Sequence, residues 1–575
     1  MQMSGAEILV KALQEEGVEV IFGYPGGVLL DFYDALFRAG MRHILTRHEQ
    51  AAAHAADGYA RASGKVGVCM ATSGPGATNL VTGIATAHMD SVPVVAFTGQ
   101  VPSHMIGGDA FQEADIIGIT RPITKHSYLA TSPGELPKIV QEAFHIASTG
   151  RPGPVVIDLP KDVLQGKGKY HRPDKVEIRG YKPKTEGHPG QIKRVLSEIM
   201  KAKRPVIYAG GGVVISGAGG ELVAFAEKNM IPVTNTLLGL GGFPGNHPLF
   251  LGMLGMHGTY QANMTIHESD LIIAIGARFD DRVTGAVAKF APSARVVHID
   301  VDPSAISKNI VVHVPVVGDV RGVLKELNKI QKGEKAVWKE IRSKWLDRVR
   351  AWGEERPLSY DRKSSLIKPQ YVIEKLSELA PDDAIITTEV GQNQMWVAQY
   401  YKFVKPRTLL SSGGLGTMGY GFPAAMGAQF AFPKRVVVDV AGDGSIQMNI
   451  QELATVAQHN IPVKIVILNN CFLGMVRQWQ ELFYDARYSQ TCLSSNPDFV
   501  KVAEAYGVKG IRISDKAEVE AGLKEALAHP GPVVVDCQID REEGVYPMVP
   551  AGAASSEMIF GPDRKKKESK LKAVK

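Results

Sequence analysis

Short segments rich in β-branched residues alternate with helical stretches along the whole length of this sequence. Many of these segments are apolar on both faces, which is typical of parallel strands that are covered by helices on both sides. Examples are VGVCMATSG at 66–74, LIIAIGA at 271–277, RVVVDVAGDG at 435–444 and VKIVILNN at 463–470. The pattern predicts an α/β fold in which mostly parallel sheets are flanked by helices.

The chain has 575 residues, which is too many for a single hydrophobic core. Two polar stretches are predicted to connect domains, namely Lys167–Pro189 and about Lys329–Lys368. The second one contains the charged amphipathic stretch KAVWKEIRSKWLDRVRAW. We therefore predict three α/β domains, of which the outer two resemble each other loosely, followed by a C-terminal segment. Their predicted bounds are 1–166, 190–328, 368–550 and 551–575.

The formal net charge of +6 comes from one end of the chain. Residues 564–575 hold seven basic residues and one acidic residue, and the rest of the chain holds 58 of each sign. A nucleic-acid-binding protein would need a basic surface on its folded body, so this class is excluded. The basic tail is predicted to be a solvated end, and contact with a partner or an anionic surface is the alternative.

Neither the cysteines nor the apolar segments predict an extracellular or membrane protein. The four cysteines are widely separated and form no CxxC pair, which argues against a disulfide framework and a zinc site. No segment approaches the roughly 20 apolar residues that cross a bilayer. We expect a cytoplasmic protein, or one supplied without its targeting peptide.

The segment from Arg435 to Asn470 predicts a magnesium site. It reads as a strand ending in Gly-Asp-Gly, a helix, and a second parallel strand ending in Asn-Asn. Ligands bind beyond the carboxyl ends of such strands, and carboxylate and amide oxygens suit Mg²⁺. A turn and a strand end would explain either element alone, but their spacing of 24 residues favours a joint site.

This spacing resembles the signature of thiamine-diphosphate enzymes. By that resemblance, the Asp443 and Asn470 side chains and the Phe472 carbonyl hold Mg²⁺, which bridges the two phosphates of the cofactor. The other implied contacts of thiamine diphosphate are Gly391, Gln392, Asn393, Gly416, Met418, Gly442, Gly444 and Met475. Met418 corresponds to the apolar residue that wedges the cofactor into its bent shape. Asn393 stands where we expect histidine beside the diphosphate.

Thiamine chemistry also needs one acid that hydrogen-bonds the aminopyrimidine ring of the cofactor. Glu49 follows a predicted strand and opens a predicted helix, where a glutamate is more often a first-turn residue. However, RHEQAAAHAADGYAR at 47–61 is similar to the pyrimidine-binding domain of the family, in which Glu49 takes the catalytic position. In the family this glutamate reaches the cofactor of a second subunit, so a homodimer is the expected minimal active unit.

Substrate-side motifs resemble the anabolic acetohydroxyacid synthase family over almost the whole chain. They include FGYPGG at 22–27, GGDAFQEADIIGITRPITKHS at 107–127, GARFDDRVTG at 276–285 and LGMVRQWQELF at 473–483. The implied reaction decarboxylates pyruvate and ligates the resulting hydroxyethyl carbanion to a second pyruvate or to 2-ketobutyrate. Its products, acetolactate and acetohydroxybutyrate, belong to valine, leucine and isoleucine biosynthesis.

The resemblance assigns roles to residues around the substrates. Arg282 matches the arginine that receives a substrate carboxylate, for which a planar cationic fork is suited. Trp479 matches the tryptophan that favours 2-ketobutyrate, and Met475 is a further substrate contact. Gln112 and Lys125 map to the active-site channel, as does Val28, where alanine is commoner, and Gly27 maps to a backbone donor near the reacting centre.

The central third has glycine-rich turns after its predicted strands, which are weak evidence for a nucleotide alone. With the family resemblance they imply a structural FAD without a redox task. The implied FAD contacts are Arg151, Gly211, Gly212, His257, Gly276, Arg278, Asp300 and Asp319.

Three other functions remain as alternatives: a catabolic acetolactate synthase without FAD, a pyruvate oxidase, and a non-catalytic scaffold. Trp479 and the Arg282 motif argue against the first, and the presence of Glu49 and Asp443 argues against the last. By the resemblance, a regulatory small subunit is an expected partner, and the oligomer is expected to be a homodimer or a homotetramer.

Overall fold

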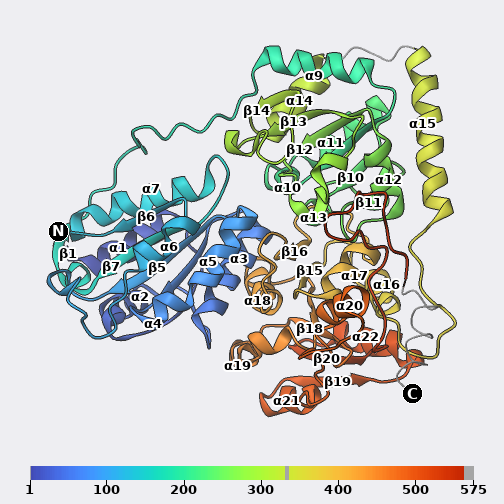
Figure 1. The fold of residues 1–575 in the computed structure, drawn as a ribbon. Helices are drawn as coiled ribbons and strands as arrows, with labels where there is room; N and C mark the ends of the chain where they lie inside the picture. The colour runs from blue at the N-terminus through green and yellow to red at the C-terminus, as the bar shows by residue number, and fades with distance from the viewer. Residues whose placement is uncertain (1, 331–335, 562–575) are drawn as a thin grey trace.

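The computed structural model describes residues 2–330 and 336–561. Figure 1 shows three α/β domains, each built around a sheet of six strands, and every strand pairing within these three sheets is parallel. The α/β fold predicted from the alternating segments is therefore confirmed. A small antiparallel pair, β1 (Gln2–Ser4) with β8 (Lys167–Lys169), joins the start of the chain to the end of the first domain. No helix among the described residues is long and apolar enough to cross a membrane.

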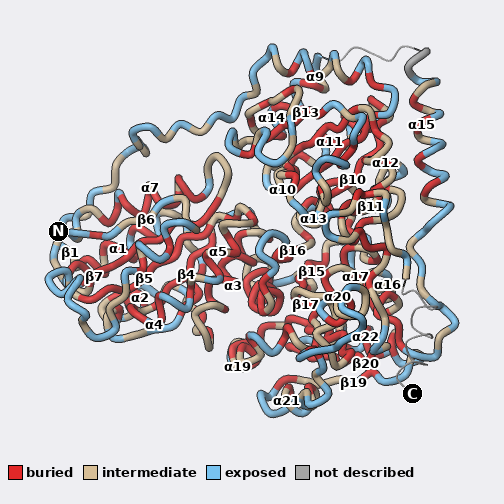
Figure 2. Tube along the Cα trace, viewed as in Figure 1, coloured by how far each residue is buried: buried red, intermediate tan, exposed pale blue. Residues whose placement is uncertain are grey.

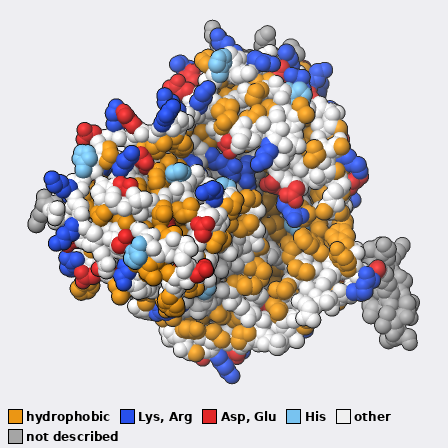
Figure 3. Space-filling view, turned by 60° about the vertical axis from the view of Figure 1, so that its left-hand side comes forward, with side chains coloured by type: hydrophobic (Ala, Val, Ile, Leu, Met, Phe, Trp, Pro, Cys, Tyr) orange, Lys and Arg blue, Asp and Glu red, His pale blue; other side chains and the backbone are white. Residues whose placement is uncertain are grey.

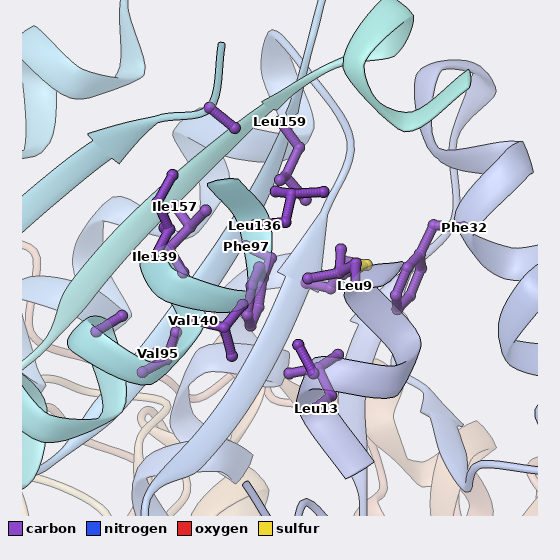
Figure 4. Close-up of a cluster of buried hydrophobic side chains, with 14 of the residues drawn as sticks. Leu9, Leu13, Phe32, Val95, Phe97, Leu136, Ile139, Val140, Ile157 and Leu159 are labelled. Carbon is purple, nitrogen blue, oxygen red and sulfur yellow. The ribbon is translucent and has the colours of Figure 1, made fainter. Parts of the chain in front are cut away.

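The N-terminal domain has the strand order β3-β2-β4-β5-β7-β6. Its strands are β2 (Ile21–Tyr24), β3 (His43–Leu45), β4 (Gly67–Ala71), β5 (Val94–Gln100), β6 (His126–Leu129) and β7 (Val155–Pro160). One face of the sheet packs against α1 (Gly5–Glu15), α2 (Leu30–Ala39) and α7 (Leu136–Ser148). Figure 4 shows this core, in which Leu9, Phe32 and Val140 from the three helices pack near Phe97 of β5. The other face packs against α3 (Glu49–Ser63) and α5 (Val81–Asp90).

The central domain has the strand order β11-β10-β9-β12-β13-β14. Its strands are β9 (Pro205–Ala209), β10 (Val233–Asn235), β11 (Phe250–Met253), β12 (Leu271–Ile275), β13 (Arg295–Asp300) and β14 (Val314–Val317). Helices α9 (Pro189–Lys201), α11 (Gly219–Asn229) and α14 (Val320–Ile330) cover one face. The strand order reverses between β9 and β12, and such a switch point is where doubly wound folds bind nucleotides.

Helix α15 (Ala336–Glu355) lies in the second predicted connector but is a covering element of the central domain. Together with α12 (Tyr260–Glu268) it packs on the second face of the central sheet. Its Trp345, Val349 and Trp352 are buried there, and Figure 2 shows buried and exposed residues alternating along it. The central domain therefore extends beyond the predicted boundary at 328.

The C-terminal domain has the strand order β16-β15-β17-β18-β20-β19. Its strands are β15 (Ile385–Thr388), β16 (Leu409–Ser411), β17 (Val437–Gly442), β18 (Lys464–Asn469), β19 (Lys509–Ile513) and β20 (Val533–Gln538). One face packs against α16 (Pro369–Leu379), α17 (Gln392–Tyr400) and α22 (Val519–Ala528), and the other against α18 (Gly421–Ala431), α19 (Leu453–His459) and α21 (Phe499–Ala505). Counted along each domain, the first and third sheets share the order 2-1-3-4-6-5. This accounts for the loose resemblance of the outer thirds.

The outer domains are joined by a close helix crossing between α3 and α18, which lie side by side in Figure 1. A Cβ atom on Gly58 would lie 2.2 Å from the Ala424 carbonyl oxygen, and one on Gly427 would lie 1.9 Å from that of Ala55. Both distances are shorter than any tolerated contact, so the crossing requires glycine at these two positions.

Candidate active site

A cavity of about 1100 Å³ lies where the three domains meet. Its walls come from the glycine turns of the central domain, from the loop 412–418 and helix α20 (Gly474–Phe483) of the C-terminal domain, and from Met89–Ser91 and Gly150–Pro152 of the N-terminal domain. Figure 3 shows basic side chains gathered around the hollow at the middle of the molecule. Four basic residues line this cavity, Arg151, Arg278, Arg282 and Lys308, and aspartates such as Asp280, Asp300 and Asp302 line it beside them.

Two glycine turns meet at the switch point of the central sheet. Gly210–Gly212 follows β9, and Gly276 follows β12 with a positive φ of 58°. A Cβ on Gly212 would lie 2.6 Å from the Cα of Gly276. Because there is no room for a side chain between the two turns, their backbones pack together. Their backbone atoms therefore face the cavity directly.

All eight residues expected to bind FAD line this one cavity, namely Arg151, Gly211, Gly212, His257, Gly276, Arg278, Asp300 and Asp319. The Arg151 guanidinium donates to Ser91 Oγ at 2.8 Å and lies 3.3 Å from the Asp302 carboxylate. Burial lowers the pKa of His257 to about 4, so its imidazole is neutral. Its Nδ1 is buried and has no hydrogen-bond partner among the described residues.

The C-terminal domain contributes the other wall of the cavity. Gly391, at φ 153°, immediately precedes α17, and Gly416, at φ 70°, lies in the loop that carries Met418. Met475 and Trp479 are four residues apart on α20, so they project from one face of that helix. All five residues line the cavity.

Arg282 lies opposite this helix face. Its guanidinium carbon is 5.9 Å from the centre of the Trp479 ring. Its side chain is 57% exposed and its carboxylate contact is the neighbouring Asp281 at 3.7 Å. The guanidinium is therefore accessible to a negatively charged ligand in the cavity.

The residues predicted to bind Mg²⁺ lie at the carboxyl edge of the C-terminal sheet, next to this wall. Asp443 follows β17 and Asn470 follows the neighbouring strand β18. The Asp443 carboxylate accepts a hydrogen bond from Asn496 Nδ2 at 2.6 Å, and Asn470 Oδ1 accepts one from the Phe472 N–H at 3.0 Å. Burial raises the pKa of Asp443 to about 6, and a bound cation would favour its charged form.

The oxygen atoms at this edge fit a Mg²⁺ ion that shares its ligands with phosphate. Within the described part of the chain, no cluster of three or more acidic, histidine or cysteine side chains forms a metal cage. One carboxylate, one amide oxygen and one backbone carbonyl leave coordination positions for phosphate oxygens, as Mg²⁺ prefers. Gly442 and Gly444 border Asp443, and a Cβ on Gly444 would lie 2.6 Å from Leu473 Cδ2.

The expected diphosphate contact of Asn393 has little support in the geometry. Its Nδ2 donates to the Glu389 carbonyl at 2.8 Å and to the Val440 carbonyl at 2.9 Å. Both amide hydrogens are therefore used inside the domain. Its Oδ1 is the atom that a Cβ on Gly391 would meet at 2.7 Å. The Asn393 side chain therefore packs beneath the backbone of Gly391 and ties it to Glu389 and Val440.

A second group of predicted residues lies at the carboxyl edge of the N-terminal sheet and outside the cavity lining. Gly27 follows β2, and Glu49 follows β3 and starts α3. Glu49 accepts a hydrogen bond from Asn79 Nδ2 at 2.9 Å, and a Cβ on Gly76 would lie 3.2 Å from it. The Gln112 carbonyl lies against Gly74, because a Cβ on Gly74 would lie 2.7 Å from the Gln112 carbonyl oxygen. The chain thus carries two half-sites at two sheet edges.

The position of Lys125 corrects its expected role in the substrate channel. Its ammonium donates to the carbonyls of Ile146 and Thr149 and to the Tyr181 hydroxyl. Its three hydrogens therefore cap the C-terminal end of α7, where a cation is favoured by the helix dipole. The motif around Lys125 predicted its neighbourhood but not the direction of its side chain.

Several buried polar residues of the site were missed by the sequence analysis. Glu389 accepts hydrogen bonds from the N–H groups of Gly419 and Phe422, next to Met418. Glu452 accepts hydrogen bonds from the Arg47 and His48 N–H groups, just before Glu49. Glu389 lies two residues before the predicted cofactor contact Gly391, and this proximity could have identified it. No local pattern predicts that Glu452 contacts a segment about 400 residues away.

Comparisons with known proteins cover almost the entire chain. Residues 3–119, 192–327 and 389–537 match the models of the N-terminal binding domain, the central domain and the C-terminal binding domain of thiamine pyrophosphate enzymes. The acetolactate synthase isozyme 3 large subunit of Escherichia coli is 52% identical over 97% of this chain and 98% of its own length. The large subunit from Buchnera aphidicola of Schizaphis graminum is 52% identical over the same shares. A probable acetolactate synthase large subunit of Methanocaldococcus jannaschii is 53% identical over 97% of this chain and 95% of its own length.

Proposed function

The chain belongs to the acetolactate synthase large subunits, within the thiamine pyrophosphate enzymes, and from this premise we propose how its residues carry the reaction. The family activity decarboxylates pyruvate and joins the remaining two-carbon unit to a second 2-keto acid. We propose that this acceptor is either pyruvate or 2-ketobutyrate. The observation that carries this proposal is that the Arg282 guanidinium lies over the Trp479 ring, in the cavity that Gly391 and Met418 also line.

Asp443, Asn470 and the Phe472 carbonyl would hold Mg²⁺, and Gly391, Gln392, Gly416, Gly442 and Gly444 would surround the diphosphate. The support is the oxygen donor set at one sheet edge and the helix α17, whose N-terminal end begins beside Gly391. When bound, the cofactor supplies the carbon acid that adds to pyruvate and accepts its electrons on loss of CO₂. Met418 would press against it from the loop 412–418, and Glu389 accepts a hydrogen bond from the N–H of Gly419, which follows this loop.

Glu49 would hydrogen-bond the aminopyrimidine ring and hold a proton there. Because Glu49 lies outside the cavity lining of its own chain, we propose that it serves the cofactor of a second copy. Gly27 and Gln112 lie at the same sheet edge and would face the reacting carbon from the same side. The minimal active unit would therefore be a homodimer, and a homotetramer would be two such units.

Arg282 would receive the carboxylate of the acceptor 2-keto acid, because its guanidinium is accessible and faces the substrate side of α20. Trp479 and Met475 would pack against the alkyl end of the acceptor. The extra methyl group of 2-ketobutyrate would bury additional apolar area on the indole ring, which favours it over pyruvate.

The remaining part of the cavity, at the switch point of the central sheet, would hold FAD in a structural role. The support is the sheet order, the two facing glycine turns and the arginines Arg151 and Arg278. The relatives are named large subunits, so we also propose a regulatory small subunit as partner. We place the protein in the cytoplasm. The basic tail at 564–575 lies outside the described residues.

The direct test is an assay of the purified chain after removal of its cofactors. Thiamine diphosphate and Mg²⁺ are added back with and without FAD, and equal pyruvate and 2-ketobutyrate compete as acceptors. We expect more acetohydroxybutyrate than acetolactate, activity that depends on FAD, and no net reduction of the flavin. Acetolactate as the sole product, formed without FAD, would refute the roles of Trp479 and the central domain. Acetaldehyde or acetyl phosphate as the main product would refute the role of Arg282.

A further inference from the structure

A chain of buried amide groups links the predicted metal ligand Asn470 to Val545, in the segment that follows β20. Asn470 Nδ2 donates to Gln392 Oε1 at 3.2 Å, and Gln392 Nε2 donates to Gln478 Oε1 at 2.9 Å. Gln478 then forms two hydrogen bonds with the backbone of Val545, accepting from its N–H and donating to its carbonyl, both at 2.9 Å. The three side-chain amides are 3% to 5% exposed.

The direction of every amide in this chain is set by the Val545 backbone, and that of Gln392 also by the Glu543 carbonyl, to which Gln392 Nε2 donates at 3.3 Å. Its N–H requires the Gln478 oxygen on one side and its carbonyl requires the Gln478 nitrogen on the other. The Gln478 oxygen then requires the nitrogen of Gln392, so the Gln392 oxygen faces the nitrogen of Asn470. The oxygen of Asn470 is consequently left on the opposite side, where it accepts the Phe472 N–H and where a cation would need it.

Gln478 also lies on the helix that carries the proposed acceptor site. It belongs to α20, between Met475 and Trp479, but points away from the cavity that these two residues line. The first residue of α20 is Gly474, and a Cβ there would lie 2.0 Å from Gln392 Oε1. The start of the helix is therefore packed directly on the amide chain, with no side chain between them.

We propose that Gln478 is a positioning residue that couples two parts of the site. Through Gln392 it orients the Asn470 oxygen toward the proposed metal position. Through Val545 it fixes the Trp479 face of α20 against the segment that follows β20. This inference rests on the proposed function, because it assigns Asn470 to Mg²⁺ and Trp479 to the acceptor.

Two substitutions separate the two links. Gln478→Met keeps the volume of the side chain but removes all its strong hydrogen bonds. The Gln392 nitrogen then keeps only its longer bond of 3.3 Å to the Glu543 carbonyl, so Gln392 and Asn470 are held less firmly. Gln478→Glu keeps an acceptor for Gln392 and for the Val545 N–H, but places a carboxylate oxygen against the Val545 carbonyl. The matched control is Gln480→Met on the same helix, because the Gln480 amide contacts the Ser489 carbonyl and the Thr491 hydroxyl instead.

Two measurements on the full-length chain report on the two links. Binding of Mn²⁺ in the presence of thiamine diphosphate, followed by the loss of the free Mn²⁺ electron paramagnetic resonance signal, reports on Asn470. The ratio of acetohydroxybutyrate to acetolactate, at equal pyruvate and 2-ketobutyrate, reports on the face of α20.

We expect Gln478→Met to weaken Mn²⁺ binding about tenfold, as loss of an outer-sphere partner of a metal ligand does. We expect it also to change the product ratio by about threefold or more, the size of one lost buried hydrogen bond. Gln478→Glu is expected to change the product ratio and leave Mn²⁺ binding within about twofold of the wild type, since its link to Gln392 remains. Gln480→Met is expected to change neither.

The inference is overturned if Gln478→Met binds Mn²⁺ and partitions its products like the wild type, or if Gln480→Met has the same effects. If Gln478→Met does not fold, Gln478→Glu decides, because equal losses in both measurements would contradict two separate links. A wild-type chain that binds Mn²⁺ but forms no acetohydroxy acid would refute the proposed function instead.

Discussion

At the scale of single residues, the candidate site combines cavity-lining groups that the sequence predicted with buried groups outside the lining that it did not. Arg282, Trp479 and Met418 were identifiable because they stand in dense motifs, and they line one cavity. Glu389 and Gln478 were not singled out, because their roles depend on partners far along the chain. Lys125 was assigned wrongly, because a motif gives the neighbourhood of a residue and not its rotamer.

Replacement of Arg282 tests the proposed carboxylate contact. We expect Arg282→Met to lower kcat/KM for the acceptor 2-keto acid by about 10-fold to 100-fold, because a charge-assisted hydrogen bond is lost. Steady-state kinetics with 2-ketobutyrate as the varied substrate measures this effect. Arg295→Met, which removes a surface ion pair with Glu198, is the control and should leave kcat/KM unchanged. Equal kinetics for both variants would rule out the contact.

Glu389 gives a prediction on pH dependence. Burial raises its pKa to about 7 from a usual value of 4.5, and burial beside Glu389 also raises the pKa of Asp439. The folded state therefore holds a proton that the unfolded state releases, so the contribution of Glu389 to stability is fully present below pH 4.5 and is lost as pH rises to about 7. We expect Glu389→Gln to flatten this decline by up to about 1.4 kcal/mol per pH unit. Thermal unfolding between pH 5 and pH 8 measures the slope, and an unchanged slope would contradict the assignment.

At the scale of elements, the strands were the most predictable part of the molecule. Apolar runs such as 271–277 and 463–470 are strands β12 and β18 because residues apolar on both faces fit a sheet covered by helices on both sides. Helix α15 was placed in a connector because its sequence reads as a charged amphipathic stretch. It packs through a narrow apolar stripe that includes Trp345 and Trp352. Such a stripe in a sequence does not show which sheet or helix it will pack against.

The crossing of α3 and α18 predicts a large effect from one added methyl group. We expect Gly58→Ala to destabilise the chain by about 2–4 kcal/mol, because its Cβ would overlap the Ala424 backbone and force the helices apart. Gly220→Ala is the matched control, since Gly220 is also helical and has open space around it. The control should be neutral or stabilising by about 0.5–1 kcal/mol. Calorimetric unfolding of both variants decides, and equal behaviour would contradict the crossing.

At the scale of the whole molecule, the two half-sites are the central feature. Asp443 lies in the C-terminal domain beside the cavity, whereas Glu49 lies at the edge of the N-terminal sheet and outside the cavity lining. The sequence analysis named both groups of residues, and their chemistry stays a prediction. The family resemblance, and not any local pattern, predicted that they meet between two copies. The homodimer stays a prediction, and it makes the activity depend on residues from two chains.

The most direct test of this account is complementation between two inactive variants. Glu49→Gln and Asp443→Asn are purified, mixed, dissociated and reassociated, and acetohydroxy acid formation is measured. In a mixed dimer one of the two sites has both an intact Glu49 and an intact Asp443, so random pairing should restore about a quarter of the wild-type activity. Either variant mixed with the double variant Glu49→Gln/Asp443→Asn should stay inactive. Absence of activity in the first mixture, in dimers shown to have exchanged their subunits, would contradict a site shared between two chains.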